Sequence, residues 1–292
     1  MTHQNEHSPD AGFKLKEIAY FMKHFMVKSN DSLANNIISD LNQFLKLGGD
    51  CNDIIEYLTE LEEYAPKSSS EDYLWELVYA RRTIKSFFEG KENYETAVEN
   101  ALIATKHFDI ICKLTPSNHN FCCRILENLT AVDCIKKTKS VSMKTNQIKE
   151  IYHNCYRLFG EMGEIEEAKK ELYYMTACYL YLDIYLFSRD HNDPKNVSFD
   201  WLSTYINFAI KRYEVDKSNS NLRQILVAYA ELSEYQNFSY KNEKESIHNV
   251  LAWAETAIEK DPTDIKRPYN RLKEIVQKFE NPVSSSASGI LN

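Results

Sequence analysis

Histidine and cysteine side chains gather in one stretch of the chain, where their types could bind a metal. The six residues are His119, Cys122, Cys123, Cys134, His153 and Cys155. Thiolate sulfur and imidazole nitrogen are ligands that zinc prefers, and neighbouring helices could bring them together. Cys122 also shares a helical stripe with Ile125 and Leu129, and burial in a core explains such thiols without a metal. We therefore expect no stoichiometric metal; if zinc were found, its ligands would be His119, Cys122, Cys134 and His153.

Other catalytic chemistry has little support. Cys123 and His119 lie four residues apart, as a nucleophile and its base could on a helix, but no third group stands near to orient them. The seven glycines are too scattered to form a phosphate-binding loop, and the sequence has no HExxH motif. We expect no enzyme activity and no cofactor.

The segment from Glu164 to Phe187 is rich in tyrosine. One helical stripe holds Tyr174, Cys178, Tyr181 and Tyr185, and a second beside it holds Leu172, Met175, Tyr179, Leu182 and Leu186. A helix that is apolar over so much of its surface is expected to pack on two sides. The alternative is a tyrosine-lined pocket wall, because Tyr hydroxyls need partners when buried and can otherwise serve ligands. That alternative corresponds to an all-helical enzyme or small-ligand binder.

The elements that would position these residues are helices. Glycine and proline number only 7 each in 292 residues, and apolar residues recur at helical spacing along most of the chain. The predicted fold is all-α, an irregular array of about twelve antiparallel helices arranged as a solenoid or layered stack. The expected domain organisation is a disordered N-terminus at 1–11, a helical array at 12–135, a basic linker at 136–147, a second array at 148–280 and a disordered tail at 281–292.

Charge and hydropathy limit the partners. The formal net charge of −8 argues against nucleic acid, which is bound through clustered Lys and Arg. No stretch is long and apolar enough for a membrane span, and the first ten residues are polar, so we expect a cytoplasmic protein. Seven cysteines without paired spacing suggest reduced thiols and no structural disulfide.

Three segments end alike. They are Ala104-x3-Phe108-x2-Ile111-x4-Pro116, Tyr205-x3-Ala209-x2-Arg212-x4-Lys217 and Val250-x3-Ala254-x2-Ala257-x4-Pro262. This pattern resembles the second helix and closing turn of a tetratricopeptide repeat. The closing positions lie 101 and 45 residues apart, whereas the family repeats about every 34 residues, so an irregular array is expected. The resemblance implies helical hairpins that form a curved surface.

The predicted function is a protein-interaction scaffold that binds a peptide or helix of another protein. By the resemblance, a helix at 219–238 would line the binding face, with a buried stripe of Leu222, Ile225, Leu226, Tyr229 and Leu232. Arg223, Gln224, Glu231 and Glu234 would then face the groove or solvent, with Tyr235 near the helix end. Arg and Tyr are frequent interface anchors, so Arg223 and Tyr235 are the predicted partner contacts. An adaptor, a regulatory subunit, a chaperone, a secreted effector and a toxin-neutralising protein all fit this description.

Overall fold

The computed structural model describes residues 55, 58–59, 61–63, 65, 70–138, 142–191 and 195–281. Within these residues all regular structure is helical and no strand occurs, which confirms the all-α prediction. They hold nine α-helices, fewer than the twelve or so expected. The predicted helices before residue 55, the predicted disordered N-terminus at 1–11 and the predicted disordered tail at 281–292, except for residue 281 itself, lie outside the described residues. No described helix is long and apolar enough to cross a membrane.

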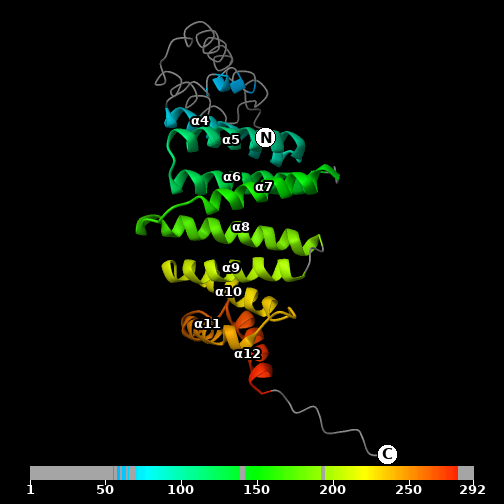
Figure 1. The fold of residues 1–292 in the computed structure, drawn as a ribbon, viewed down its shortest axis with the longest axis vertical. Helices are drawn as coiled ribbons and strands as arrows, with labels where there is room; N and C mark the ends of the chain where they lie inside the picture. Colours follow the sequence, from blue (N-terminus) through cyan, green and yellow to red (C-terminus); the bar gives the residue numbers. More distant parts are fainter. Residues whose placement is uncertain are drawn as a thin grey trace, which may run out of the picture. The chain divides into compact units, whose positions relative to one another are not determined.

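The chain divides into two compact units, Met1–Met162 and Gly163–Asn292. The first contains α4 (Glu71–Gly90), α5 (Tyr94–Leu114), α6 (Asn118–Lys137) and α7 (Ser142–Gly160). The second contains the short 3-10 helix η2 (Glu167–Lys169), α8 (Lys170–Asp190), α9 (Lys195–Val215), α10 (Asn219–Leu232), α11 (Tyr240–Lys260) and α12 (Lys266–Glu280). Within each unit every α-helix packs against the next one in sequence (Figure 1), and α10 also packs against α12.

This division differs from the basic linker predicted at 136–147. Helix α6 continues to Lys137 and α7 already begins at Ser142, so much of the predicted linker is helical. Lys137 Nζ lies 3.2 Å from Glu89 Oε1, and Lys136 Nζ lies 5.9 Å from the ring centroid of Tyr152. These basic side chains belong to a helix end that packs within the first unit.

Alternate helices begin at regular intervals. We call α4, α6, α8, α10 and α12 the first helices; they start at residues 71, 118, 170, 219 and 266, which are 47 to 52 residues apart. This interval is longer than the roughly 34 residues of a tetratricopeptide repeat. Side chains connect α4 to α6 at a sequence offset of 45, as in Arg82 to Glu127, and connect α8 to α10 at an offset of 46, in Tyr185 to Glu231.

The same turn precedes α6 and α10. Ser117 caps α6 by accepting a bond from the Asn120 amide, and Asn120 Nδ2 donates to the Thr115 carbonyl at 2.9 Å. Ser218 caps α10 in the same way, and Asn221 Nδ2 donates to the Asp216 carbonyl at 3.1 Å. Both asparagines are buried, and each side-chain amide donates to a carbonyl at the end of the preceding helix. The repeated ending seen in the sequence thus corresponds to a repeated turn at two of its three positions.

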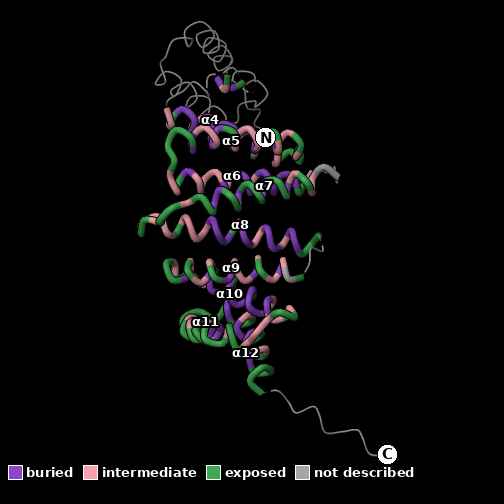
Figure 2. The backbone as a smooth tube through the Cα atoms, viewed as in Figure 1, coloured by how far each residue is buried: buried purple, intermediate pink, exposed green. Residues whose placement is uncertain are grey.

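The cores follow the predicted stripes (Figure 2). In α10 the whole expected stripe is buried, from Leu222 to Leu232. The helix ends at Leu232 rather than near 238, because the chain turns after it with the Tyr235 amide bonded to the Leu232 carbonyl. Tyr235 therefore lies in a turn, beyond the helix on which it was predicted.

Candidate functional site

The structure separates most of the proposed zinc ligands. His119 and Cys123 lie close together, with Nε2 and Sγ 3.7 Å apart. Cys134 instead donates to Glu89, and His153 is exposed. Among the described residues no three His, Cys, Asp or Glu side chains are grouped to hold a metal.

The Cys123 and His119 pair lacks the features of an activated nucleophile. Burial, with a smaller contribution from the nearby Cys122, raises the pKa of the Cys123 thiol to about 11, so the thiol stays protonated at neutral pH. The six described cysteines are free thiols. This pair therefore gives no basis for a nucleophilic mechanism.

The tyrosine-rich helix α8 is packed unevenly. Cys178, Tyr181 and Tyr185 of its first stripe are buried, as expected. In the second stripe Tyr179 is 48% exposed, and the four other members are only half-buried, so the predicted packing on two sides is incomplete. The end of α8 carries the candidate site.

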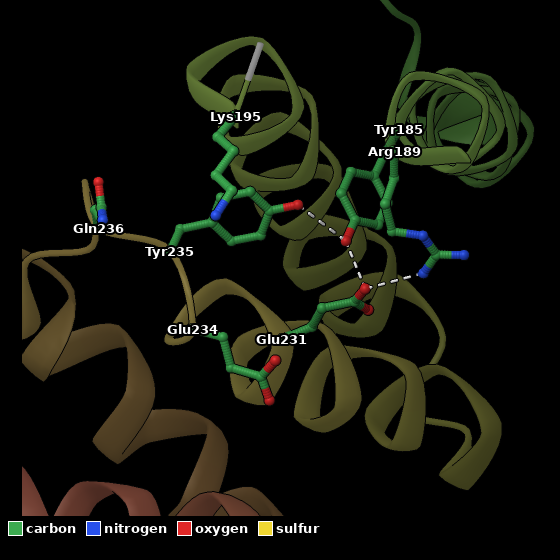
Figure 3. A pocket seen from close by; sticks show the side chains of 7 residues that line it. All are labelled: Tyr185, Arg189, Lys195, Glu231, Glu234, Tyr235 and Gln236. Carbon is green, nitrogen blue, oxygen red and sulfur yellow. Dashed lines mark hydrogen bonds and ion pairs between the residues drawn. The ribbon is translucent and has the colours of Figure 1, made fainter. Parts of the chain in front are cut away.

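The site is a network around the carboxylate of Glu231, which we call the Glu231 site. Tyr185 of α8 donates its hydroxyl proton to Glu231 Oε1 at 2.5 Å, and Arg189 Nη1 lies 3.0 Å from the same oxygen. The Tyr235 hydroxyl donates to the Tyr185 oxygen at 3.2 Å. Two helix ends and the turn after α10 are thus joined through one carboxylate (Figure 3).

Burial sets the electrostatics of the network. Tyr185 is 1% exposed, and burial raises the pKa of its hydroxyl well above the ordinary value; the bond to Glu231 raises it further, because a phenolate would face a carboxylate. Arg189 is partly exposed, and its guanidinium lies 5.7 Å from the Tyr185 ring centroid. Burial lowers the pKa of Arg189, but its bonds to Glu231 and Asp190 outweigh that effect and raise it. Both donors remain protonated at physiological pH.

A cavity of about 230 Å³ adjoins the network. Its lining comprises Tyr185, Arg189, Lys195, Glu231, Glu234, Tyr235 and Gln236 (Figure 3). Glu234 is tied to Arg271 of α12 at 2.8 Å, and Lys195 has no hydrogen-bond partner among the described residues. The cavity therefore presents hydroxyl, amide, ammonium and carboxylate groups within a small volume.

The two predicted partner contacts have different surroundings. Tyr235 lines the cavity and is half-buried, with its ring centroid 6.0 Å from that of Phe199. Arg223 is exposed on α10 and is not part of the lining. Glu231, predicted to face a groove or solvent, lines the cavity and is also bonded to Tyr185 and Arg189 of α8.

Sequence reasoning missed Arg189 and Lys195. The signal for Arg189 was its position four residues after Tyr185, which places both on one face of α8. Lys195 had no comparable signal, because its proximity to the site depends on how α9 packs on α8.

Comparisons with known proteins do not assign the site. No protein-family model matches the chain, and no curated protein matches it significantly. Among solved structures it is similar to a chain described under the computational design of self-assembling cyclic protein homo-oligomers, with 14% identity, 94% of each chain covered and a TM-score of 0.18. A TM-score that low carries no argument about fold, assembly or function.

Proposed function

We propose that the chain is an interaction scaffold whose first helices bind a segment of another protein, and that the Glu231 site receives one side chain of that segment. The main evidence for this proposal is the volume of the cavity. Pockets for small molecules usually measure about 300–1,000 Å³, whereas this one measures about 230 Å³. A single side chain projecting from a partner's backbone suits this volume better than a free metabolite.

The arrangement of helices supports the same proposal. Consecutive helical hairpins with starts 47 to 52 residues apart are compatible with a helical repeat, and helical repeats stack to present extended binding surfaces. We infer that the first helices form the binding surface, as in tetratricopeptide arrays, although here the starts of the first helices lie farther apart in sequence. The free thiols of the described cysteines fit the reducing cytoplasm, which we include in the proposal.

The small-ligand alternative has one observation in its favour, the two tyrosine hydroxyls at the cavity. Both are already engaged, since Tyr235 donates to Tyr185 and Tyr185 donates to Glu231. Any group that enters would therefore use Lys195, Glu234 and Gln236 at the edge of the cavity, and the volume of about 230 Å³ suits one side chain better than a whole small molecule. We therefore favour the scaffold.

The experiment is capture of partners from the native source, followed by binding measurements with the purified partner. Tyr235→Phe removes the hydroxyl, and Arg223→Ala removes the exposed cation; if both are anchors, the double variant should weaken binding by about 1–3 kcal/mol. Tyr179→Phe is the matched control, because this tyrosine is exposed on α8 outside the cavity. Equal affinity of the double variant and wild type, with both folded, would contradict the proposal.

A further inference from the structure

A second surface lies in the first unit, on α4. Trp75, Tyr79 and Arg82 follow at spacings of four and three residues, which places them on one face of the helix. Tyr79 is 48% exposed, the Arg82 side chain is 35% exposed and Trp75 is half-buried. Trp, Tyr and Arg are the residue types most enriched among interface hot spots, so this stripe, which we call the α4 face, has the composition of a binding surface.

The guanidinium of Arg82 is held in place by its surroundings. Its Nε donates to Glu127 Oε2 of α6 at 2.6 Å, and the Glu127 side chain is only 2% exposed. Its Cζ lies 5.8 Å from the ring centroid of Tyr79 and 5.6 Å from that of Phe108, which is fully buried. A buried carboxylate and two aromatic rings therefore fix the orientation of a partly exposed side chain.

The outer donors of this guanidinium are unused. Neither Nη1 nor Nη2 of Arg82 has a hydrogen-bond acceptor in the described part of the chain. The neighbouring Arg81 provides the contrast, because its Nε and Nη2 bind Glu62, its Nη1 binds Asn100 and its side chain is 3% exposed. Arg81 is saturated inside the fold, whereas Arg82 keeps a preorganised fork of N–H groups toward the solvent.

We propose that the α4 face binds an acidic segment of a partner protein, in which one carboxylate accepts two hydrogen bonds from Nη1 and Nη2 of Arg82. The planar fork of arginine matches a carboxylate, and a guanidinium that is already oriented loses little entropy on binding. An apolar side chain next to that carboxylate packs on Trp75 and Tyr79.

The charges around the stripe favour a carboxylate over a phosphate. Glu71 lies beside Trp75, accepting its indole N–H at 3.2 Å, and Glu127 lies behind Arg82. Because Glu127 already lies next to this guanidinium, a doubly charged phosphate at the fork would meet more repulsion than a singly charged carboxylate. This inference rests on the proposed scaffold function and assigns it a second contact surface with a defined partner chemistry.

The test is selection of short random peptides displayed on phage against the full-length chain. Enriched sequences are expected to combine Asp or Glu with an apolar residue. Synthetic copies should bind Arg82→Lys about tenfold more weakly than wild type, because lysine keeps the charge near Glu127 but lacks the fork. Arg124→Lys is the matched control, since Arg124 of α6 is likewise paired with one carboxylate, that of Asp109 at 2.6 Å, and should bind as wild type does.

A second variant keeps the test valid if Arg82→Lys fails to fold. Tyr79→Ala removes an exposed ring without entering the core and should also weaken binding. Enrichment of basic or uncharged peptides, or no enrichment, would overturn the inference, as would acidic peptides that bind the folded Arg82→Lys and Tyr79→Ala variants normally. Peptides that lose affinity only for Tyr235→Phe would also overturn it, while leaving the Glu231 site and the proposed function standing.

Discussion

Replacing Glu231 tests whether the network at the end of α8 is built as described. Glu231→Leu removes the acceptor of the buried Tyr185 hydroxyl and the partner of Arg189. Glu231→Gln keeps an oxygen that can accept from Tyr185 and removes only the charge. The two variants therefore separate the hydrogen bond from the ion pair.

The expected changes in the free energy of unfolding follow from how far Tyr185 and Arg189 are exposed. Tyr185 is 1% exposed, and a buried donor that loses its acceptor costs about 1–3 kcal/mol; the Tyr235 oxygen at 3.2 Å offers only a longer bond in place of the 2.5 Å bond to Glu231. The Arg189 side chain is 46% exposed, and an ion pair at such a site contributes about 0–1 kcal/mol. We expect Glu231→Leu to lower the free energy of unfolding by about 2 kcal/mol, and Glu231→Gln by less than about 1 kcal/mol.

The assay is urea unfolding at neutral pH followed by circular dichroism, with the slope m compared between variants. Glu234→Gln is the control, because its carboxylate is 63% exposed and pairs with the exposed Arg271; its effect should stay within about 0.5 kcal/mol. The reasoning is refuted if Glu231→Gln destabilises as much as Glu231→Leu, or if Glu231→Leu has no effect.

Three further predictions concern the fold. Glu92 has a left-handed φ of 57°, which glycine adopts with less strain than glutamate. Glu92→Gly should therefore raise the free energy of unfolding, measured by urea titration, by roughly 1 kcal/mol. A lower free energy of unfolding in this variant would contradict the strain at Glu92. Asn120→Ala and Asn221→Ala should each lower the melting temperature, at a cost of about 0.5–1.5 kcal/mol, because each removes the bond from a buried side-chain amide to a helix-end carbonyl. An unchanged melting temperature would show that the repeated turn is not stabilising. Burial alone would raise the pKa of Glu62, but bonds from Arg81 and His107 outweigh it and lower the pKa below 4.5. The stabilisation by these bonds is present above pH 4.5 and is lost as pH falls through the lowered pKa of Glu62. When the pH is lowered through that range, the free energy of unfolding should therefore fall less in Glu62→Gln than in wild type.

The helices and their buried faces could be predicted from the sequence because they depend on local spacing. The α10 stripe from Leu222 to Leu232 is buried as predicted. The end of α10 could not be placed, because the segment up to Phe238 remains compatible with a helix, and the turn that stops it at Leu232 contains no glycine or proline.

The candidate site was only partly predictable. Tyr235 was identified by residue type, but its bond to Tyr185 joins residues 50 apart, and no local pattern encodes that contact. The zinc alternative shows the same limit: Cys122 and Cys134 lie twelve residues apart on α6, about 18 Å along one helix axis, and could not bind one ion together. Spacing along a helix predicts which side chains share a face, and the packing between helices decides what that face contacts.

Photocrosslinking tests the central claim, that a partner segment lies against the first helices of the second unit. A benzoylphenylalanine placed at Arg223 on α10 and, in a separate variant, at Glu259 on α11 would be irradiated in the presence of the captured partner; both positions are exposed. We predict covalent adducts with the partner from position 223 and none from position 259. Adducts from position 259 alone, or from neither position while the partner remains bound, would contradict the account.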